Sequence, residues 1–149
     1  MRVALALAAL AALIGGTALM QPRGIRNHNP GNLRHGSPWQ GRRPLQTDPE
    51  FVQFVGPEWG IRAMVRTLRT YRDAHGLDSV RQIISRWAPP TENATDAYVE
   101  HVARVLGVHP DEPIDLEARL RPLLLTIIRH ENGVVPYPPR VIDQGIALA

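Results

Sequence analysis

The sequence contains no cysteine, which excludes a disulfide framework, a thiol nucleophile and a cysteine-ligated zinc site. It also contains no lysine, so all 17 basic residues are arginine. The histidines are scattered and no His-Glu-x-x-His pair occurs, which argues against a zinc peptidase. We therefore expect neither a metal nor a cofactor, and a fold that depends on packing alone.

The length and charge of the chain limit what remains. With 149 residues, the chain has room for one domain with a single modest core. A formal net charge of +3 suits an anionic partner, which can be nucleic acid, a membrane surface or the acidic polymers of a bacterial wall. Charge alone does not choose among these partners.

The first 20 residues differ in character from the rest. Val3 to Met20 is an uncharged run of apolar and small residues that follows Arg2. As a helix it would be about 27 Å long, close to the roughly 30 Å of a hydrocarbon core. The run predicts a signal peptide, a membrane anchor, or a segment that resembles the signal-arrest-release leaders of phage endolysins. The folded domain, residues 21–149, is then exported, and is tethered to the inner membrane or periplasmic.

The pattern of the remaining chain predicts an α+β fold that is mainly helical, with a small turn-rich β lobe and a helical lobe. Glycine, proline and asparagine recur between residues 23 and 60, which indicates turns and short strands, with a strand or hairpin arm at 51–55. Apolar periodicity and capping residues predict helices at 61–75, 80–87, 96–106, 116–130 and 141–148. Ser79 is expected to cap the second of these helices, and Thr95 or Asn93 the third.

Glu131 is the best placed catalytic carboxylate. It follows the apolar run 123–128, and Gly133 is the expected helix stop. A carboxylate in the last turn faces the negative end of the helix dipole, and partial burial there also raises its pKa. A general acid needs such a shift, although the same position also suits a solvated glutamate in a fraying turn.

Two segments resemble the soluble lytic transglycosylases. Residues 127–133, Ile-Ile-Arg-His-Glu-Asn-Gly, resemble their helix-then-Glu-Ser-Gly motif, and Thr95, Tyr98 and Val99 match their Glu-Thr-x-x-Tyr-Val segment. The glutamate of that second segment falls on Ala94 or is displaced to Glu92. The resemblance implies that Glu131 is the acid/base and that Tyr98 supports it, with Thr95 and Asn132 near the substrate.

A third segment is similar to the β lobe of flagellar-type glucosaminidases. It comprises residues 27–34, then Trp39-Gln40-Gly41, Thr47-Asp48 and residues 51–54. The resemblance implies that Asp48 is a second carboxylate across the cleft, that Trp39 is a platform for a sugar ring, and that Asn32 contacts the substrate. In those families the glutamate helix comes first, whereas here it comes last. A circularly permuted lysozyme-like domain reconciles the two orders.

The expected function is cleavage of peptidoglycan glycan strands by a monomeric lysozyme-like enzyme of phage or prophage origin. The chain from residue 23 onward also looks like small phage proteins, some of which are virion components. A non-catalytic virion or wall-binding protein is therefore the main alternative. A His-Asn-His nuclease is disfavoured, because no histidine precedes residues 27–34, so no nucleic-acid partner is expected. The residues leave open whether the reaction is hydrolysis or transglycosylation, and which glycosidic bond is cut.

Overall fold

The computed structural model describes residues 21–90 and 94–149. The predicted leader, residues 1–20, lies outside this range, as do Glu92 and Asn93. Within the described residues, no helix is both long enough and apolar enough to cross a bilayer.

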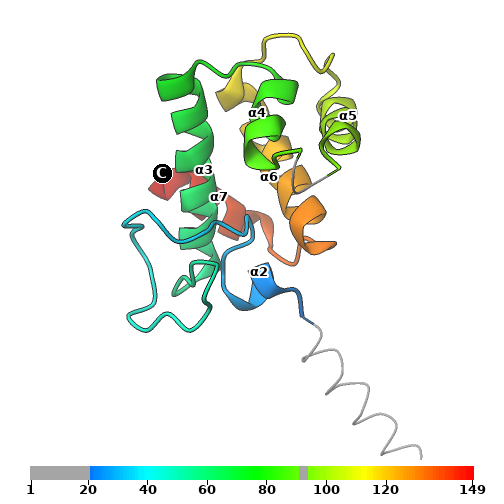
Figure 1. The fold of residues 1–149 in the computed structure, drawn as a ribbon. Coiled ribbons are helices and arrows are strands. Elements are labelled where there is room, and N and C mark those ends of the chain that lie inside the picture. The colour runs from blue at the N-terminus through cyan, green and yellow to red at the C-terminus, as the bar shows by residue number, and fades with distance from the viewer. Residues whose placement is uncertain (1–20, 91–93) are drawn as a thin grey trace, which may run out of the picture.

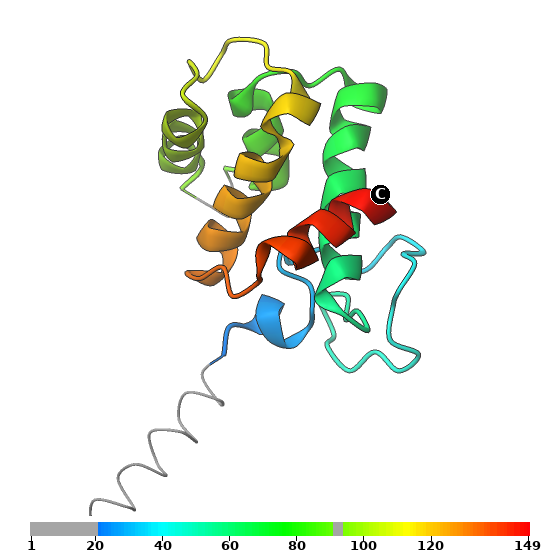
Figure 2. The same cartoon turned by 180° about the vertical axis from the view of Figure 1, so that it is seen from behind.

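The described part of the chain is mainly helical, as the sequence predicted (Figure 1). Of the described residues, 56% are in helices and 5% in strand-like pairing. Its helices are α2 (Arg23–Arg26), α3 (Pro57–His75), α4 (Val80–Trp87), α5 (Thr95–Leu106), α6 (Leu116–Asn132) and α7 (Pro139–Leu148). Helix α5 packs against both α4 and α6, whereas α3 packs against α6 and α7, and α2 packs against α6. Figure 2 shows α7 crossing α3, with the turn-rich segment beside the first turns of α3.

The helix ends follow local chemistry. Ser79 accepts a hydrogen bond from the backbone N–H of Gln82, which confirms it as the cap of α4. Helix α3 begins at Pro57, earlier than predicted, because proline is well tolerated in the first turn of a helix. The cap predicted at Thr95 is wrong: the N-cap position of α5 is Ala94, and the Thr95 hydroxyl instead donates to the carbonyl of Ala88 at 2.6 Å.

The predicted strand at 51–55 forms only two isolated bridges, one from Phe51 to Arg34 and one from Phe54 to Arg42. Irregular backbone hydrogen bonds, such as those from Val52 to Leu33 and from Phe54 to Asn27, and side-chain amides complete the pairing. The backbone N–H of Gln53 donates to Oε1 of Gln46, and Oε1 of Gln53 accepts from the backbone N–H of Thr47. The turn-rich lobe is therefore held by irregular backbone bonds and amide side chains and not by a regular sheet. Helix α2, which the sequence reasoning missed, is a single turn of four residues at the start of the turn-rich lobe.

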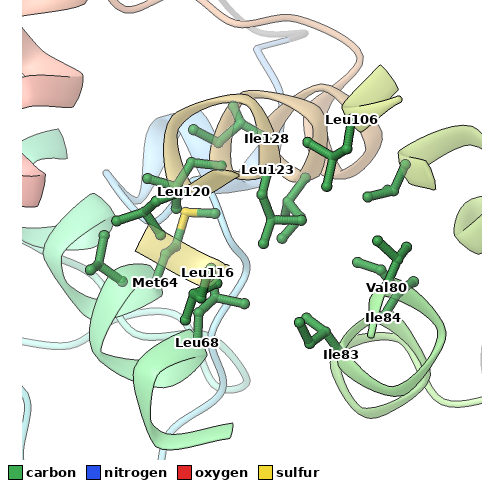
Figure 3. Close-up of a cluster of buried hydrophobic side chains, with 14 of the residues drawn as sticks. Met64, Leu68, Val80, Ile83, Ile84, Leu106, Leu116, Leu120, Leu123 and Ile128 are labelled. Atoms are coloured by element: carbon green, nitrogen blue, oxygen red, sulfur yellow. The ribbon is translucent and has the colours of Figure 1, made fainter. Parts of the chain in front are cut away.

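The core has two parts. The larger lies between α3, α4, α5 and α6 and includes the side chains in Figure 3, among them Met64, Leu68, Ile83 and Leu123. The smaller lies under the turn-rich segment, where Val52, Phe54 and Ala63 pack against Leu33, Trp39 and Trp59. Each lobe thus has its own apolar support, and residues of both lobes line the cavity beside Glu131.

Candidate active site

Glu131 occupies the last turn of α6, which ends where Gly133 adopts a left-handed conformation with φ of 75°. Its carboxylate is partly buried and accepts two long hydrogen bonds, from Nδ2 of Asn32 at 3.2 Å and from Nε1 of Trp87 at 3.4 Å. Burial raises the pKa of Glu131, and the two donors only partly oppose that rise. This is the direction that a general acid at neutral pH requires.

The carboxylate lines a cavity of about 650 Å³, a size typical of ligand sites. Both lobes contribute to its wall. The lining residues are Gly31, Asn32, Leu33, Arg34, Phe51, Tyr71, Arg86, Trp87, Ala88, Pro89 and Glu131. Among the described residues, Glu131 is the one carboxylate in this wall.

Asn32 is held in position by close packing around α2. It is one of two non-glycine residues with positive φ in the described chain, at 50°. A Cβ on Gly24 would lie 2.5 Å from Oδ1 of Asn132 and 2.8 Å from Oδ1 of Asn32, so only glycine fits between the two amides. Nδ2 of Asn132 donates to the carbonyl of Pro30 at 2.8 Å, which ties the same loop to α6. Asn132 is therefore a buried structural contact and does not line the cavity.

Tyr98 lies next to the site but not in it. Its buried ring stacks on His130 with centroids 4.0 Å apart, and it is not a lining residue. Burial and the nearby charge of Glu131 raise the pKa of Tyr98. Within the described residues its hydroxyl has no hydrogen-bond partner. Tyr98 can thus support the end of α6 through His130, but its hydroxyl makes no hydrogen bond to Glu131.

Asp48 does not line the cavity that contains Glu131, where the sequence predicted it to lie across the cleft. Its side chain is only 8% exposed and accepts from Nε and Nη2 of Arg23 at 2.7 and 2.6 Å, and from Nδ2 of Asn27 at 2.8 Å. The Arg23 guanidinium is the main reason that the pKa of Asp48 falls well below its usual range. Asp48 lines a separate cavity of about 360 Å³ with Arg23, Asn27 and Gln53 among its neighbours.

Of the other predicted site residues, some line a cavity and others make structural contacts. Asn32 lines the cavity, but its amide donates to Glu131. Thr95 is buried and joins α5 to the end of α4. Trp39 lines an adjoining cavity of about 290 Å³ that shares Leu33, Arg34, Tyr71 and Arg86 with the first. No group of metal-ligating side chains occurs within residues 21–90 and 94–149.

Sequence reasoning missed several residues of the wall, among them Trp87 and Arg86. The ring of Trp87 packs partly against the main core. Its indole N–H nevertheless reaches Glu131. The Ala88-Pro89-Pro90 segment marks the end of α4, which was the available signal that these two side chains stand at an edge of the helical lobe.

Comparison with known proteins places the chain among phage proteins. It is 40% identical over 127 residues to Protein P5 of Pseudoalteromonas phage PM2, an alignment that covers 83% of this chain and 79% of the relative. The chain belongs to the P5 family. No protein-family model matches the sequence. Because the alignment covers most of both chains, the similarity extends into both lobes.

Proposed function

We propose that this member of the P5 family is a lysozyme-like enzyme that cuts the glycan strands of peptidoglycan. The observation that carries the proposal is the partly buried carboxyl of Glu131, with its raised pKa, in a cavity formed by both lobes. A raised pKa favours the protonated form of the carboxyl group, which can donate its proton to a glycosidic oxygen, and this donation is the first requirement of glycoside cleavage.

Lytic transglycosylation is the reaction that this arrangement favours. The Glu131 carboxyl donates its proton to the glycosidic oxygen as the bond from that oxygen to the anomeric carbon breaks. The C6 hydroxyl of the same sugar then attacks the anomeric carbon, and its proton passes to the Glu131 carboxylate. The ring closes to an anhydro sugar, no water is consumed, and the acid is restored.

The position of Asp48 supports this choice over hydrolysis. An inverting hydrolase needs a second carboxylate roughly 6.5–9.5 Å from the acid, with room for water between the two. Asp48 instead lines another cavity and is occupied by Arg23 and Asn27. Among the residues that the structure describes, no other carboxylate lines the wall around Glu131.

Export and a phage context belong to the same proposal. The uncharged run at residues 3–20 would carry the domain across the inner membrane as a signal peptide or an anchor, so that a monomeric enzyme acts in the periplasm. The phage origin of the P5 relative supports a role as an endolysin or as a virion-associated lysin.

Zymography on purified peptidoglycan tests the proposal. We expect the wild-type chain to clear the gel and Glu131→Gln to lose clearing, because glutamine keeps the shape of the side chain without the proton. Glu100→Gln is the matched control, since Glu100 is exposed on α5 and lines no described cavity around Glu131. If the wild type does not clear, or if Glu131→Gln clears as well as the wild type, the proposed enzyme is wrong and a non-catalytic virion or wall-binding protein is favoured.

A further inference from the structure

The cavity at Glu131 adjoins two further cavities, and the three are together called the groove. It shares Leu33, Arg34, Tyr71 and Arg86 with the cavity beside Trp39. That second cavity shares Ser37, Trp39 and Thr70 with a third one, of about 360 Å³. Three adjoining cavities suit a ligand that is a chain of several units and not a single small molecule.

Arginines line this groove, and acidic residues are scarce in it. The residues of its first two cavities that carry a charged or basic side chain are Arg34, Arg86, His75 and Glu131. Basic side chains therefore outnumber acidic ones among the described lining residues of these two cavities. A ligand that extends from Glu131 along the groove would therefore bind more tightly if it carried negative charge.

Arg86 is arranged to bind an anion. Its guanidinium lies over the ring of Tyr71, 5.3 Å from the centroid, which fixes the plane of the group. Its side chain is exposed at the junction of the two cavities, and within residues 21–90 and 94–149 it has no carboxylate partner. By contrast, Arg23, Arg69 and Arg81 each pair with an acidic side chain.

We infer that the groove between Arg86 and Trp39 is a subsite for a sugar that carries a carboxylate, and that Arg86 binds this carboxylate. A planar guanidinium matches a carboxylate with two parallel hydrogen bonds. The half-exposed indole of Trp39 offers an apolar surface to the sugar ring beside it. The inference deepens the proposed function and rests on it: in peptidoglycan the carboxylate belongs either to the lactyl group of the muramyl residue or to its peptide.

Calorimetric titration of the full-length Glu131→Gln variant tests this subsite, because that variant is expected to bind without cutting. Three hexasaccharides are compared: a neutral hexamer of N-acetylglucosamine, a peptide-free peptidoglycan hexamer with free lactyl carboxylates, and the same hexamer with its peptides. We expect at least one acidic hexamer to bind roughly tenfold more tightly than the neutral one, which is the size of one charge-assisted hydrogen-bonded contact. Whichever acidic hexamer gains more identifies the source of the carboxylate.

Adding Arg86→Gln should remove most of that preference, and Arg86→Lys should retain part of it, since lysine keeps the charge but not the planar pair of donors. Arg104→Gln is the matched control, because Arg104 is exposed on α5 and lines none of the three cavities. The preference should also weaken with added salt.

The outcomes separate the subsite from the enzyme. Equal binding of neutral and acidic hexamers, or a preference that Arg86→Gln leaves intact, would overturn the subsite even if the wild type clears peptidoglycan. If the wild type releases no product from peptidoglycan but the preference for acidic hexamers still depends on Arg86, the subsite stands and the proposed enzyme is rejected. Tighter binding of a single-stranded oligonucleotide than of either acidic hexamer would overturn the inference in favour of a nucleic-acid groove.

Discussion

Asp48 holds the turn-rich lobe to α2, so replacing it should reduce stability much more than catalysis. Its carboxylate accepts five hydrogen bonds: two from Arg23, one from Asn27, and one each from the backbone N–H groups of Glu50 and Phe51. Asp48→Asn keeps the size of the side chain but replaces one acceptor oxygen with a donor that faces the guanidinium.

The size of the effect follows from burial. Removing one partner of a buried ion pair costs about 3–5 kcal/mol, because the other charge is left uncompensated. The Arg23 side chain is 38% exposed, so water compensates part of this loss. We expect Asp48→Asn to lower the free energy of unfolding by about 2–4 kcal/mol, which corresponds to a fall in melting temperature on the order of 10 °C.

The effect should depend on pH in a defined direction. Since the folded-state pKa of Asp48 is depressed, its contribution is fully present above the unfolded-state value of about 4 and is lost as the pH falls toward the folded-state value. Thermal melts of wild type and Asp48→Asn should therefore differ most near pH 7 and converge below about pH 4.

The control for this prediction is Glu50→Gln. Glu50 also pairs with Arg23, but its side chain is 53% exposed, so we expect a loss of no more than about 1 kcal/mol. If Asp48→Asn instead melts like the wild type and loses peptidoglycan-cleaving activity as completely as Glu131→Gln, then Asp48 is a catalytic carboxylate and the structural role argued above is wrong.

Two substitutions and one product analysis test the site itself. Asn32→Gly keeps the positive φ but removes a donor that lowers the pKa of Glu131, so the basic limb of the pH profile of kcat/KM should move to higher pH; a shift to lower pH would contradict the role of Asn32. Gly24→Ala forces a Cβ against the Asn32 and Asn132 amides and should destabilise the fold by about 1–3 kcal/mol with a loss of activity, whereas unchanged melting would show that α2 can shift freely. Mass spectrometry of a wild-type digest should find anhydro-muramic ends, and fragments heavier by one water would establish hydrolysis instead.

Much of the helical lobe was predictable because its signals are local. Ser79 caps the start of α4, α5 ends at Gly107, and α6 runs from Leu116 to its end at Gly133. The residues that set these boundaries, and the apolar periodicity of the helices, lie within a few residues of each boundary. The turn-rich lobe was less predictable. Its backbone is satisfied by side-chain amides such as that of Gln53, whose partners are set by tertiary contacts and not by any periodic pattern.

The same distinction separates Glu131 from Asp48. The position of Glu131 at a helix end follows from the apolar run before it and the glycine after it, whereas its raised pKa comes from burial of the carboxyl group in the folded chain. Asp48 resembled a second catalytic carboxylate in its motif. Its actual surroundings depend on Arg23, 25 residues earlier in the chain, which no local pattern linked to it.

The contacts around Glu131 also show what the proposed circular permutation, in which the acid helix follows the turn-rich lobe, would require. Asn32 and Glu131 are 99 residues apart in sequence, yet they share a hydrogen bond, and the bond from Asn132 to Pro30 spans 102 residues. What the proposed chemistry requires is that the acid at a helix end lies against the turn-rich lobe, and that requirement concerns adjacency in space. Whether the lobe precedes or follows the acid helix changes only the connecting segments, which can be rejoined where they lie at the surface. The packing of α2 and residues 28–32 onto the end of α6 is therefore the structural feature on which the proposed permutation depends.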